Sequence, residues 1–120
     1  MTGLAALIHH GALAANRGGQ SGLSESGVAS FYGPRHNGRR TAWGGRFDQS
    51  AMTGAHPWLP FGTRVRVTAA ETGRTVVVVI TDRMPARRRI IDLSMAAARQ
   101  LGILREGIAR VSLTALTERP

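Results

Sequence analysis

Cysteine and lysine are absent from this 120-residue sequence, and aromatic residues make up only 5% of it. Without cysteine, the sequence offers no disulfides, thiolate metal sites, cysteine nucleophile or cysteine-linked lipid anchor. No segment is both long enough and apolar enough to predict a membrane span. Basic residues are not interleaved with aromatic ones in the manner of single-strand binders, which argues against nucleic acid as a partner.

Positive charge is what the chain has in excess. All sixteen basic residues are arginines, and the formal net charge is +9 at pH 7. Such a charge attracts anionic partners, among which nucleic acid, a membrane surface and an acidic cell-wall polymer all qualify. The arginines are scattered, apart from the clusters at 39–40 and 87–89. We therefore expect no nucleic-acid partner.

Residues 1–24 differ in composition from the rest of the chain. The stretch Leu4–Ala15 is apolar, but it contains His9 and His10 and is not preceded by the cationic segment of a secretion signal. The following "NRGGQSGLS" has the composition of a linker. Two interpretations stand, a truncated secretion leader and a flexible extension. Residues 25–117 then form the single domain that this length allows.

The pattern of the remaining residues predicts short strands. "TRVRVT" (63–68) alternates strictly, with Val65 and Val67 on one face, and "RTVVVVIT" (74–81) returns after a glycine-containing turn, which predicts a hairpin. One short helix is expected between a cap at Ser94 and a stop at Gly102. Further strands are predicted over 27–32, 89–93 and 107–116. Together these elements predict an all-β fold, a small closed barrel of five or six strands.

The run Val76–Ile80 is apolar without alternation, so we expect it to be covered on both faces, with the helix or a crossing loop on the outside. Asp82 and Arg83 follow this strand directly. Asp82 has two interpretations from the residues alone. It anchors the turn or pairs with an arginine, or it is a reactive carboxyl held at the end of a rigid strand.

Several separated motifs, in order, resemble one known family. "GVASFYGPRHNGRRTAWGGRFDQSAMTGAHPWLPFGTRVRVT", "TGRTVVVVITDRMP" and "RIIDLSMAAARQLG" closely resemble the rare lipoprotein A (RlpA) family over residues 26–116. The resemblance implies a six-stranded double-psi β-barrel, a fold also used by expansins. It further implies a septal lytic transglycosylase that acts on peptidoglycan strands stripped of stem peptides.

The family's functional positions are matched in part. Its Asp-Arg-Gly-Pro segment is matched by Asp82, Arg83 and Pro85. Its Thr-Ala-Ala-His segment is matched at His56, and its Phe-Asp pair by Phe47 and Asp48. Other positions depart from the pattern, and Met84 stands where the Asp-Arg-Gly-Pro segment has glycine. Trp43 stands where the family has asparagine, and Gly45 stands where it has its functional glutamate. Because glycine cannot exchange a proton through a side chain, this departure bears directly on catalysis.

A site that lacks the family's glutamate can still perform the lytic transglycosylase reaction with one acid. A lytic transglycosylase uses the sugar's own C6 hydroxyl as nucleophile, so one carboxyl that gives a proton and takes one back can suffice. Asp82 is the expected acid/base, with His56 as its orienting or proton partner. Asp48, Arg83, Trp43, Tyr32 and the Gly45 position are expected to line the substrate groove.

Two functions follow from this pattern. The first is an RlpA-type lytic transglycosylase that leaves 1,6-anhydro ends during cell-wall remodelling. The second, favoured by Gly45, is a non-catalytic, expansin-like module that binds glycan or loosens the wall. In either case we expect peptidoglycan glycan strands as the partner, a monomer, no cofactor, no metal, and a periplasmic or secreted location. No histidine or carboxylate spacing typical of a metal site is seen.

Overall fold

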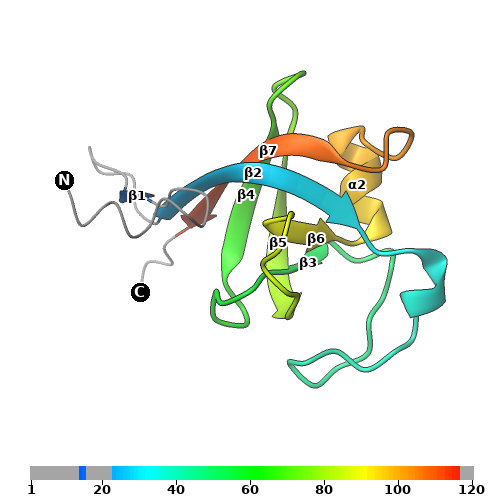
Figure 1. The fold of residues 1–120 in the computed structure, drawn as a ribbon. Helices are drawn as coiled ribbons and strands as arrows, with labels where there is room; N and C mark the ends of the chain where they lie inside the picture. The colour runs from blue at the N-terminus through cyan, green and yellow to red at the C-terminus, as the bar shows by residue number, and fades with distance from the viewer. Residues whose placement is uncertain (1–13, 16–22, 117–120) are drawn as a thin grey trace.

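The computed structural model describes residues 14–15 and 23–116, and its β-strands form one closed sheet (Figure 1). The elements in chain order are β1 (Ala14–Ala15), β2 (Leu23–Phe31), the 3-10 turn η1 (Pro34–His36), β3 (Thr53–Ala55), β4 (Arg64–Ala69), β5 (Thr75–Asp82), β6 (Ile91–Leu93), α2 (Met95–Leu101) and β7 (Ala109–Leu116). All the predicted strands and the single predicted helix are present.

The sheet closes into a six-stranded barrel. Its order is β2-β6-β3-β5-β4-β7, with β7 pairing back to β2, while β1 pairs with β2 outside this ring. The β2–β6 and β3–β5 pairs are parallel, and the others are antiparallel. This mixed, closed sheet with one short helix confirms the predicted fold class. In Figure 1, the loop between β2 and β3 extends away from the barrel, and it supplies much of the site described below.

The predicted hairpin is β4 and β5, paired from Arg64 with Val79 to Thr68 with Thr75. Val65 and Val67 face the core, as their alternation predicts. In β5, Val76, Val78 and Ile80 are buried, whereas the valines between them are half-buried. The expectation that this run is covered on both faces is therefore only partly correct, because Val77 and Val79 remain half-buried.

The helix α2 begins and ends where the sequence predicts. Ser94 is its N-cap, and the Ser94 hydroxyl accepts a hydrogen bond from the Ala97 N–H. Gly102 ends it with φ 85°, a left-handed conformation that glycine adopts without strain, and its N–H bonds back to Ala98. The helix buries Ala97, Ala98 and Leu101 against the barrel.

The predicted boundary at residue 25 falls inside β2, which begins at Leu23. The strand β1 lies within the segment predicted to be a leader, and it pairs with β2 through Ala14 and Ala15. The rest of that segment lies outside the described residues, so the leader and the boundary stay predictions. No helix in the described part of the chain is long and apolar enough to cross a membrane.

Replacing Val78 by aspartate should unfold the domain. Val78 is fully buried in the middle of β5, and an unpaired charge there costs several kcal/mol against a total stability of about 5–15 kcal/mol. Val77→Asp is the matched control, since Val77 is half-buried on the other face and lies across from the exposed Arg66. Melting curves should show a cooperative transition for the control only. A cooperative melt of Val78→Asp near the parent's temperature would contradict the barrel.

Candidate functional site

Asp82 ends β5, and its carboxylate is held by groups from three segments. Its Oδ1 accepts the backbone N–H groups of Ala42 and Arg83, each at 3.0 Å. Its Oδ2 lies 3.4 Å from the Tyr32 hydroxyl, the one group in the described part of the chain that donates to this oxygen. Asp82 is half-buried. The carboxylate therefore has a fixed orientation, with Oδ1 occupied and Oδ2 held only by a long contact.

Tyr32 follows β2 and packs between two rings. It stacks on the His36 ring at 4.8 Å and meets the Phe47 ring edge-on at the same distance. Burial, followed by the negative charges of Asp82 and Asp92 and the hydrogen bond to Asp82, raises the pKa of Tyr32 well above its ordinary value. Tyr32 therefore remains a neutral hydroxyl donor beside Asp82 at every working pH.

The arginine beside Asp82 does not use its guanidinium to bind that carboxylate. Arg83 Nη1 donates to the carbonyl of His56 at 3.2 Å, and the guanidinium lies 4.1 Å from the centre of the Phe61 ring. Because the Arg83 backbone N–H does bind Asp82, the carboxylate anchors the turn through the main chain. The Arg83 side chain lies over an aromatic ring on the rim of the site.

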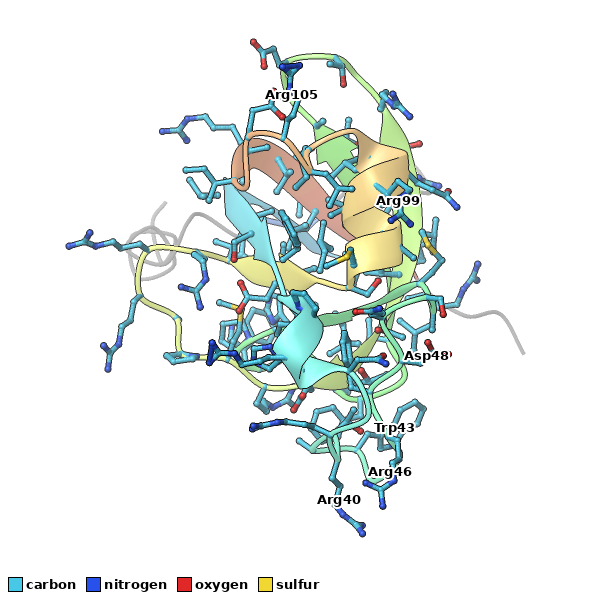
Figure 2. The ribbon with its side chains drawn as sticks, turned by 90° about the vertical axis from the view of Figure 1, so that its right-hand side faces the viewer. Arg40, Trp43, Arg46, Asp48, Arg99 and Arg105 are labelled. Carbon is cyan, nitrogen blue, oxygen red and sulfur yellow. The ribbon has the colours of Figure 1, made fainter. Side chains whose placement is uncertain are left out.

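The loop from 33 to 52 lies against the end of β5 and includes Trp43 and Gly45. The Trp43 N–H donates to the Thr81 carbonyl at 3.1 Å, while its ring is 54% exposed and lies 6.4 Å from Phe61. Figure 2 shows Trp43 near Arg40 and Arg46 toward the tip of this loop. The indole is thus exposed, as expected, while its contact with a sugar stays a prediction.

Gly45 lines a small cavity of about 120 Å³ whose walls also include Thr41, Trp43, Asp48 and Thr81. The Gly45 carbonyl accepts the Thr41 N–H at 2.7 Å and the Thr41 hydroxyl at 3.2 Å, so the backbone here is fixed. A Cβ added at Gly45 would meet no atom within 4 Å, and the backbone φ angle of Gly45 lies outside the left-handed region. A side chain at this position would therefore extend into open space.

Asp48 accepts hydrogen bonds from the Ser50 hydroxyl at 2.7 Å and the Ser50 N–H at 2.9 Å. These two bonds lower the pKa of Asp48 from its ordinary value. Asp48 therefore stays ionised at neutral pH. Its geometry suits a loop anchor and a fixed negative charge at the cavity.

The His56 ring bonds to partners other than Asp82. His56 is 1% exposed, and its Nε2 lies 3.0 Å from Glu25 Oε1. Its Nδ1 accepts the N–H groups of Trp58 and Leu59, both at 3.2 Å. With both nitrogens engaged among the described residues, His56 reaches Asp82 only through its backbone N–H, which donates to the Asp82 carbonyl at 3.1 Å. A proton-transfer role for His56 stays a prediction that rests on the resemblance alone.

The Glu25–His56 pair was not predicted from the sequence. Glu25 is 5% exposed and lies 31 positions before its partner. Neither residue belongs to a spacing that signals an ion pair, so only the closure of the barrel brings them together. A carboxylate buried this deeply inside a strand is the sequence feature that points to a partner. The pair fixes the turn that holds the Asp82 backbone.

Comparison with known families gives a match over most of the chain. The model of a family described as "Lytic transglycolase" matches residues 24–113. A probable endolytic peptidoglycan transglycosylase RlpA from a Synechocystis strain is 54% identical over 90 residues, covering 74% of this chain and 28% of the relative. The endolytic peptidoglycan transglycosylase RlpA of Neisseria meningitidis serogroup A is 45% identical over 92 residues, covering 76% and 38%. The matched part thus spans well under half of each relative's length.

Solved structures give the same architecture. The Streptomyces papain inhibitor aligns with a TM-score of 0.64 and 27% identity, covering 78% of this chain and 94% of the inhibitor. The unliganded Clavibacter michiganensis expansin aligns with a TM-score of 0.65 and 23% identity, covering 81% of this chain and 52% of the expansin. The likeness to the expansin supports the barrel fold alone.

Proposed function

Since the chain belongs to the RlpA family of lytic transglycolases, with its double-psi β-barrel, we propose that it cleaves peptidoglycan glycan strands without water and leaves 1,6-anhydro ends. The observation that carries this proposal is the geometry of Asp82. Its carboxylate is oriented by two backbone N–H groups and the Tyr32 hydroxyl, and it lies in the family's Asp-Arg-x-Pro segment.

In the proposed reaction, Asp82 delivers a proton to the glycosidic oxygen as the bond from that oxygen to C1 breaks. The C6 hydroxyl of the same sugar attacks C1 and forms the anhydro ring. Its proton passes to the Asp82 carboxylate, which restores the acid. Oδ2 is the oxygen suited to both transfers, because Oδ1 is occupied by two N–H groups. No external nucleophile is consumed.

The neighbouring side chains have supporting roles in this proposal. The Trp43 ring stacks on a pyranose face, Tyr32 orients Oδ2, and the Arg83 guanidinium contacts substrate oxygens from the rim. Asp48 contributes fixed negative charge, which favours a positive oxocarbenium-like centre. His56, with Glu25, acts as a positioning residue that holds the Asp82 backbone.

A second candidate function is a binding module that holds glycan and does not cleave it. Gly45 favours it, because the family's glutamate is missing and the cavity at this position is left without the side-chain carboxyl. The other acid in that cavity, Asp48, is held in its ionised form by Ser50. In this case the groove and the exposed Trp43 would be kept for binding alone.

Incubating the protein with glycan strands stripped of stem peptides separates the two candidates. We expect products with 1,6-anhydro ends, detected by mass spectrometry, because one positioned acid/base can perform both proton transfers. A family member with the glutamate serves as the positive control. Strands that are bound but never cleaved would overturn the enzymatic proposal and leave the binding module.

The proposed substrate also sets the expected location. Peptidoglycan lies outside the cytoplasmic membrane, so we propose that the protein acts in the periplasm or after secretion, as a monomer.

A further inference from the structure

A second cavity, of about 360 Å³, lies apart from the one at Gly45. It opens where the loop between β5 and β6 (residues 83–90) meets β2 and the turn after His56. Its walls include Trp58, Arg87, Arg88, Ile90 and Arg110. The proposed reaction uses none of these side chains.

The walls of this cavity are fixed by packing. Ile90 donates its N–H to the Val28 carbonyl at 2.8 Å and lies against Gly27, where an added Cβ would come within 2.7 Å of Ile90 Cγ2. Glycine at this position thus lets the loop lie directly on β2. On the opposite wall, Trp58 meets the buried His56 ring edge-on at 5.1 Å and remains 44% exposed. An indole is therefore held in place with much of its surface open to a ligand.

The cavity has uncompensated positive charge. Among the described residues, no carboxylate pairs with Arg87, Arg88 or Arg110, and all three are exposed. By contrast, the adjacent Arg89 binds Asp92 through both Nε and Nη2. The one acid in the lining, Glu25, is already engaged by His56. An anion entering the cavity would meet guanidinium groups that have no competing internal partner.

The edge of β2 adds main-chain hydrogen-bonding groups to this cavity. On this edge β1 pairs no further than Ser24, and β6 begins its pairing at Ala29. The Val28 carbonyl points to this edge, since it accepts the Ile90 N–H, and alternate residues of a strand point the same way. The N–H and C=O of Ser26 therefore face the cavity, where they can bind an amide group.

We propose that this cavity is a second subsite, which binds the carboxylate-bearing part of peptidoglycan. The inference rests on the proposed function for the identity of the polymer. Peptidoglycan carries carboxylates on its lactyl groups and stem peptides, and amides on its acetamido groups and peptides. The arginines would bind the carboxylates, Trp58 would cover an apolar face, and Ser26 would pair with an amide.

The backbone of the turn before Trp58 connects the subsite to Asp82. His56, two residues before Trp58, donates its N–H to the Asp82 carbonyl and accepts the Arg83 guanidinium on its own carbonyl. We expect one polymer chain to contact both sites. The subsite would select which strands, or which stretches of a strand, reach Asp82.

Binding of soluble muropeptides, measured by calorimetry at low ionic strength, tests the subsite. We expect the double variant Arg87→Gln, Arg88→Gln to bind muropeptides roughly tenfold more weakly than the parent does. A loss of this size is at the lower end of what charge-assisted hydrogen bonds contribute. The matched control is Arg99→Gln with Arg105→Gln, which removes the same charge from exposed positions on and after α2. Figure 2 shows Arg99 and Arg105 far from Trp43, toward the opposite end of the molecule.

Muropeptides whose carboxylates have been amidated should bind the parent and the Arg87/Arg88 variant equally. Separate titrations with the disaccharide and with the free stem peptide identify which carboxylate is bound. If both pairs of arginine substitutions weaken muropeptide binding equally, the effect comes from the overall charge and the subsite proposal fails. The proposal also fails if the Arg87/Arg88 variant binds as tightly as the parent. The assay needs no cleavage. If the parent forms no anhydro ends, and the Arg87/Arg88 substitutions still weaken muropeptide binding as predicted, the proposed function fails and the subsite stands.

Discussion

Asp82→Asn should lower the rate of anhydro-end formation by about 10²–10⁴-fold and leave the melting temperature unchanged. An asparagine side-chain oxygen can still accept the N–H groups of Ala42 and Arg83, so the loop and the turn keep their anchor. The amide cannot donate and regain a proton as the carboxyl does. Rates on stripped glycan strands and melting curves, measured on the same preparations, separate chemistry from stability.

Glu71→Gln is the matched control for this substitution. It makes the same carboxyl-to-amide change at an exposed position in the turn between β4 and β5. If Asp82 only anchors the turn, Asp82→Asn should melt at a lower temperature and keep activity in proportion to the folded fraction. That result would remove Asp82 from the chemistry.

Gly45→Glu should raise the rate by about 10²–10⁴-fold, the usual contribution of a positioned acid or base. The position accepts a side chain without strain, because a Cβ there meets no atom within 4 Å and the backbone is held by Thr41. The new carboxyl would lie beside the cavity that Gly45 lines with Trp43 and Asp48. The measurement is the initial rate of anhydro-end formation, compared with that of the parent.

Gly45→Gln fills the same space without an acid, and it should leave the rate near the parent's. A rate increase shared by both variants would point to packing of the loop instead of proton transfer. If the parent forms no product and Gly45→Glu does, the chain is a binding module that retains an otherwise competent groove. If neither forms product, the enzymatic proposal fails.

Local patterns predicted five of the six barrel strands and the helix, but they missed the short strand β3. Strict alternation identified β4, and the cap at Ser94 with the stop at Gly102 fixed both ends of α2. These signals work because each depends on a few neighbouring residues. The uninterrupted apolar run of β5 predicted burial less well, because apolar residues are also tolerated at half-buried positions such as Val77 and Val79.

The candidate site was harder to predict because its contacts join distant segments. The resemblance identified Asp82, but no local pattern gives its bonds to Tyr32 and Ala42, which lie 50 and 40 positions away. The same holds for His56, whose ring binds the buried Glu25 instead of facing Asp82. Barrel closure sets these pairs, and periodicity within one strand contains no information about which strands meet.

The pairing of β2 with β7 has a consequence for how the chain folds. Ser24 pairs with Thr114 and Ala29 with Ala109, so this pairing joins the first long strand to the last. The entropy of closing that large loop must be overcome before these contacts stabilise anything, which slows folding relative to a helical domain of the same size. During synthesis the barrel cannot close until residue 116 has left the ribosome. The earlier strands therefore remain without their closing partner until β7 is available.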